Sequence, residues 1–350
     1  MTWDGKKVLV TGGASFIGSH LVDKLLGMGA EVLVADDLSS GRIENLEYPL
    51  VRSGSSLQYR NLSVEIGDLR ERDFTKSVMK KVNTVFHLAA SHGGRGYIDS
   101  HPVECCTNML LDQLVFQEAF SAGVEHVCFA SSACVYPDHL QGEPGSQYLL
   151  KEDDANPFVR DKAMADLEYG WAKLMGEMTI LAYHEEYGLN TSAVRIFTAY
   201  GPRENETHAI IALIAKAFIR QDPYTIWGTG EQDRNFTYVE DIVDALVLAA
   251  DKIKDGAPVN AGRSDRITIN QACEVLFKLC DWKPSEIVHE KNRPQGVASR
   301  AADLTKAREV LGWEPKVPYE DGFQKTINWY FKHKDPDQIR RNLNRLLLER

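Results

Sequence analysis

Near its amino terminus the chain reads VLVTGGASFIG (residues 8–18). The aliphatic run at residues 8–10 predicts a buried strand, and the apolar spacing from Phe16 to Leu25 predicts an amphipathic helix directly after the turn. In a strand–turn–helix unit of this kind, backbone N–H groups and the positive end of the helix bind a pyrophosphate. We therefore expect a dinucleotide site at this turn.

The turn has most of the glycines that such a site requires. Gly12 permits a tight turn, and Gly18 allows the helix to pack closely on the strand. The middle glycine of the usual pattern, which lets the backbone approach the phosphates, is replaced by Ser15. Serine adds only one small polar group, so we expect dinucleotide binding to persist. A glycine-rich turn can also be purely structural, and the interpretation therefore depends on a second feature.

That second feature is an acidic pair after the next predicted strand. The aliphatic run at residues 31–35 ends at Asp36 and Asp37, roughly 20 residues after the turn. A carboxylate there accepts hydrogen bonds from the adenosine ribose and repels a 2′-phosphate. The pair predicts NAD rather than NADP, with Asp36 as the ligand and Asp37 as a loop cap. Asp68, after the strand predicted at residues 62–66, suits an adenine contact, although such a residue is also typical of an N-cap or a turn.

Strands and helical patterns alternate through the first half of the chain. Further strands are predicted at residues 84–88, 127–130 and 192–197, and helices at residues 108–122, 168–186 and 209–219. Strands separated by helices indicate a parallel sheet covered on both faces. We expect an α/β protein with a Rossmann-type, doubly wound parallel sheet and a smaller mixed α/β C-terminal lobe. Residues 258–260 and 267–279 would contribute a strand and a helix to that lobe.

The expected domain boundaries follow from this pattern. Residues 1–190 would form the NAD-binding domain and carry the catalytic residues. Residues 191–332 would form mainly a substrate-binding lobe, with some chain returning to the sheet. Residues 333–350 are charged, with leucines at helical spacing, and predict a C-terminal tail or surface helix.

The composition excludes several classes of protein. The net charge is −10 and no basic run is present, so we expect no nucleic-acid partner. The six cysteines lack C-x-x-C spacing, which indicates free thiols and neither disulfides nor a metal site. No stretch approaches the roughly 20 apolar residues of a membrane span, and the residues before the first strand leave no room for the apolar core of a signal peptide. We expect a cytoplasmic protein without membrane association.

A catalytic group is indicated by Tyr169 and Lys173, which lie four residues apart and so share one helix face. An ammonium group close to a phenol lowers the pKa of the phenol, which would make Tyr169 a base for a sugar hydroxyl near neutral pH. A single pair with this spacing is common on solvated helices. Here it follows a Ser131-Ser132 pair at the end of a predicted strand, and the combination is far more specific.

Taken together, these motifs resemble the extended short-chain dehydrogenase/reductase family over roughly residues 5 to 330. Shared motifs continue along the chain as FHLAA (residues 86–90), YGP (200–202), RNF (234–236), NAG (260–262) and LGW (311–313). The resemblance implies NAD as the cofactor. The cofactor-binding residues that it implies are Gly12, Ser15, Phe16, Ile17, Gly18, Asp36, Asp68, Leu69, Leu88, Ala89, Ala90, Tyr169 and Lys173.

Within that family the sequence is most similar to the GDP-mannose 3,5-epimerases. SHGGRG (residues 91–96) resembles their glycine-rich loop over the sugar, and SSACVYP (131–137) resembles their cysteine-bearing segment. In 4,6-dehydratases an acidic pair occupies the places of Ala133 and Cys134, which argues against dehydration by that route. Simple 4-epimerases generally have a small inert residue where Cys134 stands.

The resemblance implies a mechanism. Tyr169 would take the proton from the sugar O4 while hydride passes from C4 to NAD, and Ser132 would hydrogen bond the same oxygen. The resulting 4-ketone acidifies C3 and C5, where the Cys134 thiolate would remove a proton. Reprotonation from the opposite face would invert the centre, and Lys173 would hold the nicotinamide ribose.

This chain departs from the epimerases at three positions. Their opposite-face acid is a lysine, and His208 stands in its place. A histidine can donate a proton at neutral pH, although it could also be an ordinary loop residue. Thr207 and Thr198 replace an acid and an asparagine that lie near the nucleotide base, which weakens the expectation of GDP. The substrate-binding residues implied are Gly93, Gly94, Arg95, Ser131, Thr198, Lys216, Gln232, Arg234 and Arg300.

Three readings remain. The first is a nucleotide-sugar epimerase with a 4-keto intermediate, either of the 3,5 type or another 4-epimerase. The second is a 5,6-dehydratase or decarboxylase that begins with the same oxidation. The third is a non-catalytic NAD-sensing protein, which would usually lose the Tyr169 and Lys173 pair. The substrate would be a nucleotide-diphosphate sugar, and the family pairing of helices near 108–122 and 168–186 implies a homodimer.

Overall fold

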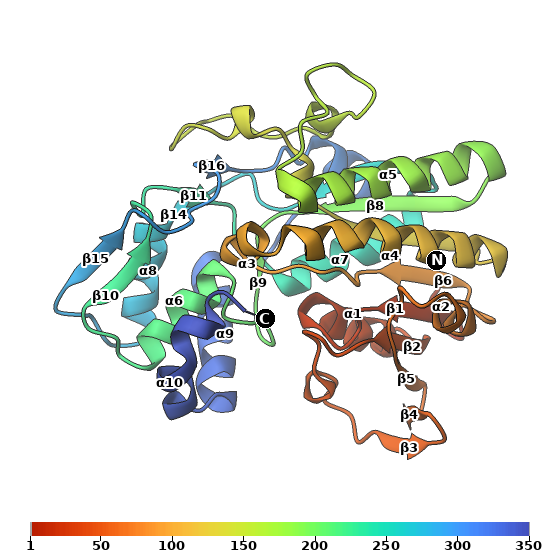
Figure 1. Cartoon of the computed structure of the whole chain (residues 1–350), viewed down its shortest axis with the longest axis horizontal. Coiled ribbons are helices and arrows are strands. Elements are labelled where there is room, and N and C mark those ends of the chain that lie inside the picture. The colour runs from red at the N-terminus through yellow and green to blue at the C-terminus, as the bar shows by residue number, and fades with distance from the viewer. Residues whose placement is uncertain (1, 350) are drawn as a thin grey trace.

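Residues 2–349 are described by a computed structural model, and they contain a nine-stranded sheet (Figure 1). The strand order is β13-β8-β7-β6-β1-β2-β5-β4-β3. Seven of these strands run parallel: β1 (Lys7–Thr11), β2 (Glu31–Asp36), β5 (Leu62–Ile66), β6 (Thr84–His87), β7 (His126–Ser132), β8 (Asn190–Ile196) and β13 (Asp255–Ala261). The edge is closed by an antiparallel hairpin of β3 (Val51–Ser53) and β4 (Ser56–Tyr59), which the sequence did not predict.

Helices cover both faces of the sheet. On one face α1 (Phe16–Gly27) packs beside α7 (Val239–Lys252), and on the other α4 (Pro102–Ser121) lies beside α5 (Leu167–Tyr187) and α2 (Arg72–Val78). The sheet is covered by two separate hydrophobic clusters. Within β1, Val8 and Val10 pack in one of these clusters, and Leu9 packs in the other. A strand buried on both faces needs apolar residues at consecutive positions, which explains the uninterrupted aliphatic run. The doubly wound α/β fold predicted from the sequence is confirmed.

A smaller lobe stands at the carboxyl ends of the strands (Figure 1). Its helices are α6 (Ala209–Phe218), α8 (Ile269–Leu279), α9 (Tyr319–His333) and α10 (Pro336–Leu346). Its strand pairs are β10 (Tyr224–Trp227) with β15 (Ile287–Glu290), β9 (Ala199–Tyr200) with β12 (Thr237–Tyr238), and β11 (Asp233–Arg234) with β14 (Ile267–Thr268) and β16 (Ser299–Arg300). The short helix α3 (Arg95–Ser100) faces this lobe from the sheet side.

Three segments after residue 190 belong to the sheet layers, namely β8, α7 and β13. The strand expected in the small lobe at residues 258–260 was therefore placed wrongly, because it lies in β13 and pairs with β8. A short apolar run cannot show which sheet will receive it. The helix expected from residue 108 begins at Pro102, where the fixed φ of proline suits a first helical turn.

The charged C-terminal segment forms α10, which packs against α6. The Asp335 side chain accepts a hydrogen bond from Asp337 N and caps the helix, while Ile339 and Leu343 bury its apolar side. Of the helices formed by residues 2–349, none combines the length and the apolar character needed to cross a membrane.

Candidate active site

Two adjoining cavities lie at the carboxyl ends of the parallel strands. The larger has a volume of about 670 Å³ and separates the sheet from the C-terminal lobe, and the smaller has a volume of about 200 Å³. Four residues line both cavities: Ser15, Ser40, Leu88 and Ala90. Ligands of open parallel sheets bind at this end of the strands. The pair of cavities is therefore continuous along the glycine-rich turn.

The glycine-rich turn is packed too closely for larger residues. Gly12 has a positive φ of 68°, and a Cβ there would lie 3.0 Å from the Ala89 backbone. A Cβ on Gly18 would lie 2.1 Å from the carbonyl oxygen of Gly12. Ser15, Phe16 and Ile17 line the larger cavity, Gly12 and Ser15 line the smaller one, and Ser15 is the N-cap residue of α1. This arrangement fits a dinucleotide pyrophosphate at the helix N-terminus.

Acidic residues mark the smaller cavity. Asp36 ends β2, and its carboxylate accepts hydrogen bonds from Ala14 N and Leu38 N, each at 2.9 Å. Burial raises the pKa of Asp36, and these backbone hydrogen bonds oppose that rise. Asp68 lines the same cavity, together with Leu69, and is held by three hydrogen-bond donors of Arg70. These residues fit the adenosine half of NAD.

A buried chain of hydrogen bonds connects β1 and β6 to α4. The Thr11 hydroxyl accepts hydrogen bonds from Leu88 N and Ala89 N, both at 3.1 Å, and lies 2.8 Å from His87 Nδ1. With both acceptor positions used, the hydroxyl must donate to His87 Nδ1. His87 Nε2 then donates to Asp112 at 2.9 Å. Burial lowers the pKa of His87, which agrees with a neutral ring.

The Asp112 carboxylate also affects the pKa of Lys173. Burial lowers the pKa of Lys173, and the Asp112 carboxylate partly offsets that change. The Lys173 ammonium lies 4.6 Å from the Phe129 ring centre and 5.9 Å from that of Tyr169. The sequence had no obvious sign of Asp112, since it lies in the middle of an ordinary helix. It is the carboxylate that favours the charged form of Lys173.

Tyr169 is buried beside Ser132 and Cys134 in the wall of the larger cavity. Burial raises the pKa of Tyr169 well above its usual value, Cys134 and Asp112 add to the rise, and a hydrogen bond with Ser132 opposes it. The expectation that Lys173 lowers this pKa is therefore wrong for the protein alone. Desolvation by the surrounding core outweighs an ammonium group at this distance.

Cys134 is fixed by its backbone. Its N–H donates to the Ser132 hydroxyl at 3.1 Å, and its carbonyl accepts a hydrogen bond from Asp166 N at 2.8 Å. A Cβ on Gly170 would lie 2.2 Å from the same carbonyl oxygen. The turn that carries Cys134 and the start of α5 that carries Tyr169 therefore touch through the backbone.

Three arginines surround the Cys134 side of the cavity. Arg300 Nη1 donates to Cys134 Sγ at 3.8 Å, and Arg95 Nη1 donates to both oxygens of Asp166 at 3.0 Å. Burial and repulsion from Arg300 and Arg95 lower the pKa of Arg234 to about 9. Guanidinium groups held this closely suit an anionic ligand such as a diphosphate. Asp166, which the sequence analysis missed, keeps two of them in place.

The loop before α6 lines the same cavity. His208 Nδ1 contacts Glu204. The His92 ring lies between the rings of His208 and Tyr169, with its centre 5.1 Å from the His208 ring centre and 4.7 Å from the Tyr169 ring centre. Gly94 N donates to the Thr207 hydroxyl at 3.1 Å, and a Cβ on Gly94 would overlap the Thr207 carbonyl. The predicted sugar loop and the His208 loop therefore close one side of the cavity together.

The predicted substrate residues all line the larger cavity: Gly93, Gly94, Arg95, Ser131, Thr198, Lys216, Gln232, Arg234 and Arg300. Burial lowers the pKa of Lys216 to about 8, although its ammonium still donates to Thr225 O at 2.8 Å. Gln232 Oε1 and Arg300 Nη2 are buried and have no hydrogen-bond partner within residues 2–349. An acceptor and a donor left open at a cavity wall are suited to ligand contacts.

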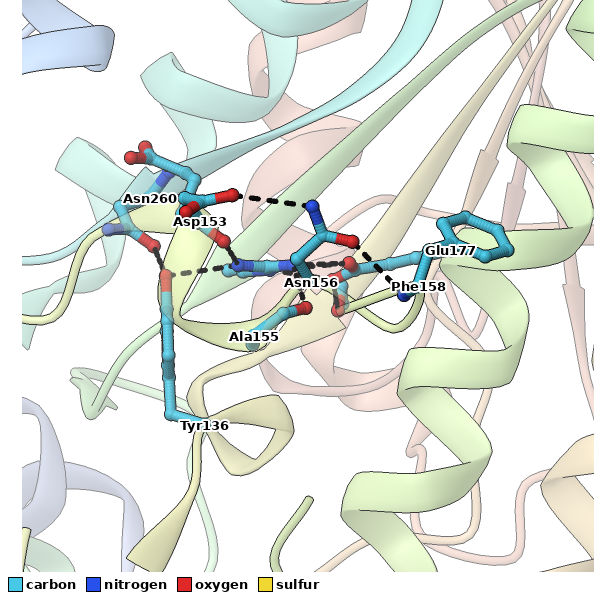
Figure 2. Close-up of polar contacts among 10 residues, drawn as sticks. Tyr136, Asp153, Ala155, Asn156, Phe158, Glu177 and Asn260 are labelled. Atoms are coloured by element: carbon cyan, nitrogen blue, oxygen red, sulfur yellow. Dashed lines mark hydrogen bonds and ion pairs between the residues drawn. The ribbon is translucent and has the colours of Figure 1, made fainter. Parts of the chain in front are cut away.

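Within this set, the Ser131 hydroxyl donates a hydrogen bond to Glu177. Glu177 accepts hydrogen bonds from Arg195 at 2.9 and 2.7 Å, and Figure 2 shows the surrounding contacts with Tyr136 and Asn260. Arg195 also donates to the carbonyl of Ala155. This buried ion pair ties α5 to β7, β8 and the chain after residue 150. The sequence analysis gave these residues no role, because their partners are distant in sequence.

Comparison with known proteins identifies the family of the chain. The sequence matches the NAD dependent epimerase/dehydratase family over residues 8–262. It is 31% identical to GDP-mannose 3,5-epimerase 1 of Oryza sativa subsp. indica over 338 residues, which cover 93% of this chain and 82% of that protein. It is also 31% identical to UDP-glucuronic acid decarboxylase 1 of Arabidopsis thaliana, with coverage of 92% and 69%.

The fold agrees with solved structures of the same kind. A structure of UDP-glucose 4-epimerase with UDP-glucose from Thermotoga maritima superposes with a TM-score of 0.79 and 28% identity, over 93% of this chain and 99% of that one. The names of these relatives cover two kinds of epimerisation and one decarboxylation.

Proposed function

The chain belongs to the NAD dependent epimerase/dehydratase family, whose members act on nucleotide sugars, and we propose that it is an isomerase that epimerises a nucleotide-diphosphate sugar. The reaction would pass through a transient 4-keto sugar and would be of the GDP-mannose 3,5-epimerase type. The observation that carries the proposal is that Cys134, beside Ser132 and Tyr169, lines the same cavity as His208.

The family depends on NAD, and bound NAD would supply the acceptor for the C4 hydride and a positive charge that favours the phenolate form of Tyr169. Tyr169 takes the proton from the sugar O4, and Ser132 hydrogen bonds that oxygen. The low exposure of Tyr169 and Lys173 excludes bulk water from this proton transfer. Asp112 favours a charged Lys173, which binds the nicotinamide ribose.

Inversion at carbon uses two further groups. The ketone at C4 acidifies the neighbouring C–H bonds, and Cys134 removes a proton from one face. His208 returns a proton to the opposite face. Arg95, Arg234 and Arg300 would hold the diphosphate. Arg300 Nη1 donates a hydrogen bond to Cys134 Sγ at 3.8 Å and so helps to fix the position of the sulfur.

A substrate panel in heavy water tests this function. The holoenzyme would be incubated with GDP-, UDP-, dTDP- and CDP-linked sugars, and proton NMR would locate deuterium in the products. We expect inversion with deuterium at C3 or C5 and no change of formula apart from the isotope. Inversion at C4 alone, without exchange at C3 and C5, would instead identify a simple 4-epimerase.

Two variants separate the roles of the carbon acid and base. Cys134→Ala should lose exchange at C3 and C5 while NAD is still transiently reduced when substrate is added. His208→Ala should retain exchange through Cys134 but lose inversion, because no acid serves the other face. Normal exchange in Cys134→Ala would rule out the thiol as the base.

One observation favours a second candidate function. The three guanidinium groups beside Cys134 could also bind a sugar carboxylate, and a decarboxylase is among the relatives. Decarboxylation would release carbon dioxide from a uronate, so the mass of the product distinguishes the two reactions. Retention of Tyr169 and Lys173 within the cavity disfavours a non-catalytic NAD sensor.

We also propose a homodimer formed through α4 and α5. These helices lie side by side on one face of the molecule (Figure 1). Leu167, Trp171 and Met175 are spaced four residues apart on α5 and are exposed, and Leu110 is exposed on α4. A second copy of the chain would cover this apolar surface.

A further inference from the structure

The loop that precedes α6 contains a buried carboxylate, that of Glu204, which belongs to none of the sequence motifs described above. Glu204 is 2% exposed, and its Oε1 contacts His208 Nδ1 one helical turn away in sequence. Its other oxygen, Oε2, is buried and has no hydrogen-bond partner in the part of the chain that the structure describes. A carboxylate so placed is costly to bury unless it interacts with a positive charge.

The opposite side of the same imidazole has no hydrogen-bond partner in the part of the chain that the structure describes. His208 Nε2 is buried and finds no partner among residues 2–349, and His208 lines the larger cavity. The ring contacts His92, which in turn contacts the Tyr169 ring. Nδ1 is therefore occupied by the protein, while Nε2 is the nitrogen left for a ligand.

Other charges near this loop are already paired. Glu206 accepts a hydrogen bond from Tyr330 at 2.8 Å and forms an ion pair with Lys334 at 3.0 Å. Arg203 pairs with Asp23 at 2.7 Å and with Glu47 at 3.4 Å. From the sheet side, the rings that face His208 are those of His92 and, beyond it, Tyr169. Glu204 is the carboxylate in direct contact with the imidazole.

We propose that Glu204 is a positioning residue that orients His208 and holds it as an imidazolium, with the Nε2 proton aimed into the cavity. The proposal rests on the proposed function for the use of that proton. The pKa of His208 agrees with the geometry: burial would lower it, but the charge and hydrogen bond of Glu204 outweigh burial and raise it above 6.5. Burial also raises the pKa of Glu204, and the charge and hydrogen bond of His208 oppose that rise. His208 therefore carries its Nε2 proton before the sugar binds.

The protons balance in the inversion at carbon. Cys134 takes one proton from carbon, and the electron pair of that C–H bond passes into the enolate. His208 then breaks its Nε2–H bond as a new C–H bond forms on the opposite face. The products are a Cys134 thiol and a neutral His208 beside an unchanged Glu204 carboxylate, and solvent exchange restores the starting state.

Nitrogen-15 NMR of histidine in the NAD-bound enzyme tests the proposal without requiring turnover. We expect His208 in the wild-type protein to titrate above 6.5, with the proton of Nδ1 shared with Glu204. In Glu204→Gln the carboxylate charge is lost while burial remains, so the pKa should fall by about one unit or more. Glu204→Asp keeps the charge and should restore part of the shift. A His208 that titrates at or below 6.5 in the wild type, or at the same pH in Glu204→Gln, would overturn the proposal.

Kinetics provide a second readout. Imidazolium is present below the pKa and is lost as the pH rises through it, so the alkaline limb of inversion should move to lower pH in Glu204→Gln. Transient reduction of NAD should keep its normal pH dependence. Glu206→Gln is the matched control, since it changes a buried carboxylate of the same loop that does not contact His208. If the pKa of His208 falls but inversion keeps its wild-type profile, the positioning role of Glu204 stands and the assignment of His208 as the acid is wrong.

Discussion

Among single side chains, the Tyr169 hydroxyl carries the most specific chemical role. Replacing Tyr169 by Phe removes the proton acceptor but leaves the ring that packs against His92. Turnover should fall by about 10²–10⁴-fold, the usual contribution of general acid–base catalysis. The amount of NAD released on denaturing the protein should stay the same. Steady-state kinetics and cofactor analysis measure both quantities.

The matched control is Tyr148→Phe, which removes an exposed hydroxyl bonded to Asp154. This variant should keep wild-type turnover. A Tyr169→Phe enzyme that retains more than about a tenth of the wild-type rate would be incompatible with an essential base.

At the scale of elements, the contact between α5 and the turn at Cys134 determines how the base and the phenol face each other. Gly170→Ala would place a Cβ 2.2 Å from the Cys134 carbonyl oxygen, so helix and turn must separate. A displacement near 1 Å can cost about 10²-fold in rate. We expect kcat to fall by about that factor while NAD remains bound, because the glycine-rich turn is untouched.

Gly27→Ala is the control for the glycine substitution itself. Gly27 ends α1 with a helical backbone, and its added Cβ would meet nothing within 4 Å. Alanine should stabilise this helix by about 0.5–1 kcal/mol and leave kcat unchanged. Equal kcat values for Gly170→Ala and the wild type would show that the site tolerates the displacement.

For the whole molecule, the apolar surface of α4 and α5 predicts assembly. Trp171 is 42% exposed and Met175 is 45% exposed on neighbouring turns of α5. Trp171→Glu should convert a dimer into monomers, because a charge cannot be buried in the interface without a partner. Light scattering coupled to size exclusion would measure the mass of both proteins.

Val51→Glu serves as the control for this prediction. Val51 is exposed on the edge strand β3, which lies away from α4 and α5 (Figure 1). Its replacement should leave the mass of the assembly unchanged. A wild-type protein that elutes with a mass close to 39.3 kDa would refute the dimer.

Local features of the sequence were sufficient for the architecture. Aliphatic runs at consecutive positions require burial on both faces, and so predicted the parallel sheet and its helices. The glycine-rich turn and Asp36 predicted a dinucleotide site, because the function of each depends on residues that are close to it in the sequence. The edge hairpin β3–β4 was not predicted, since its strands are short, β3 is exposed throughout and β4 has no buried residue.

Contacts between distant residues came only from the tertiary structure. Asp112 beneath Lys173, Asp166 beside Arg95 and Glu177 with Arg195 are charges whose partners lie on other elements, and no local pattern shows such pairs. The pKa of Tyr169 was predicted with the wrong sign for the same reason, because desolvation depends on everything packed around the phenol. The sequence by itself determined the fold and the cofactor, and it supplied the candidates for the reactive groups. The tertiary structure decided their charge states and neighbours, because both depend on burial and on residues brought together by folding.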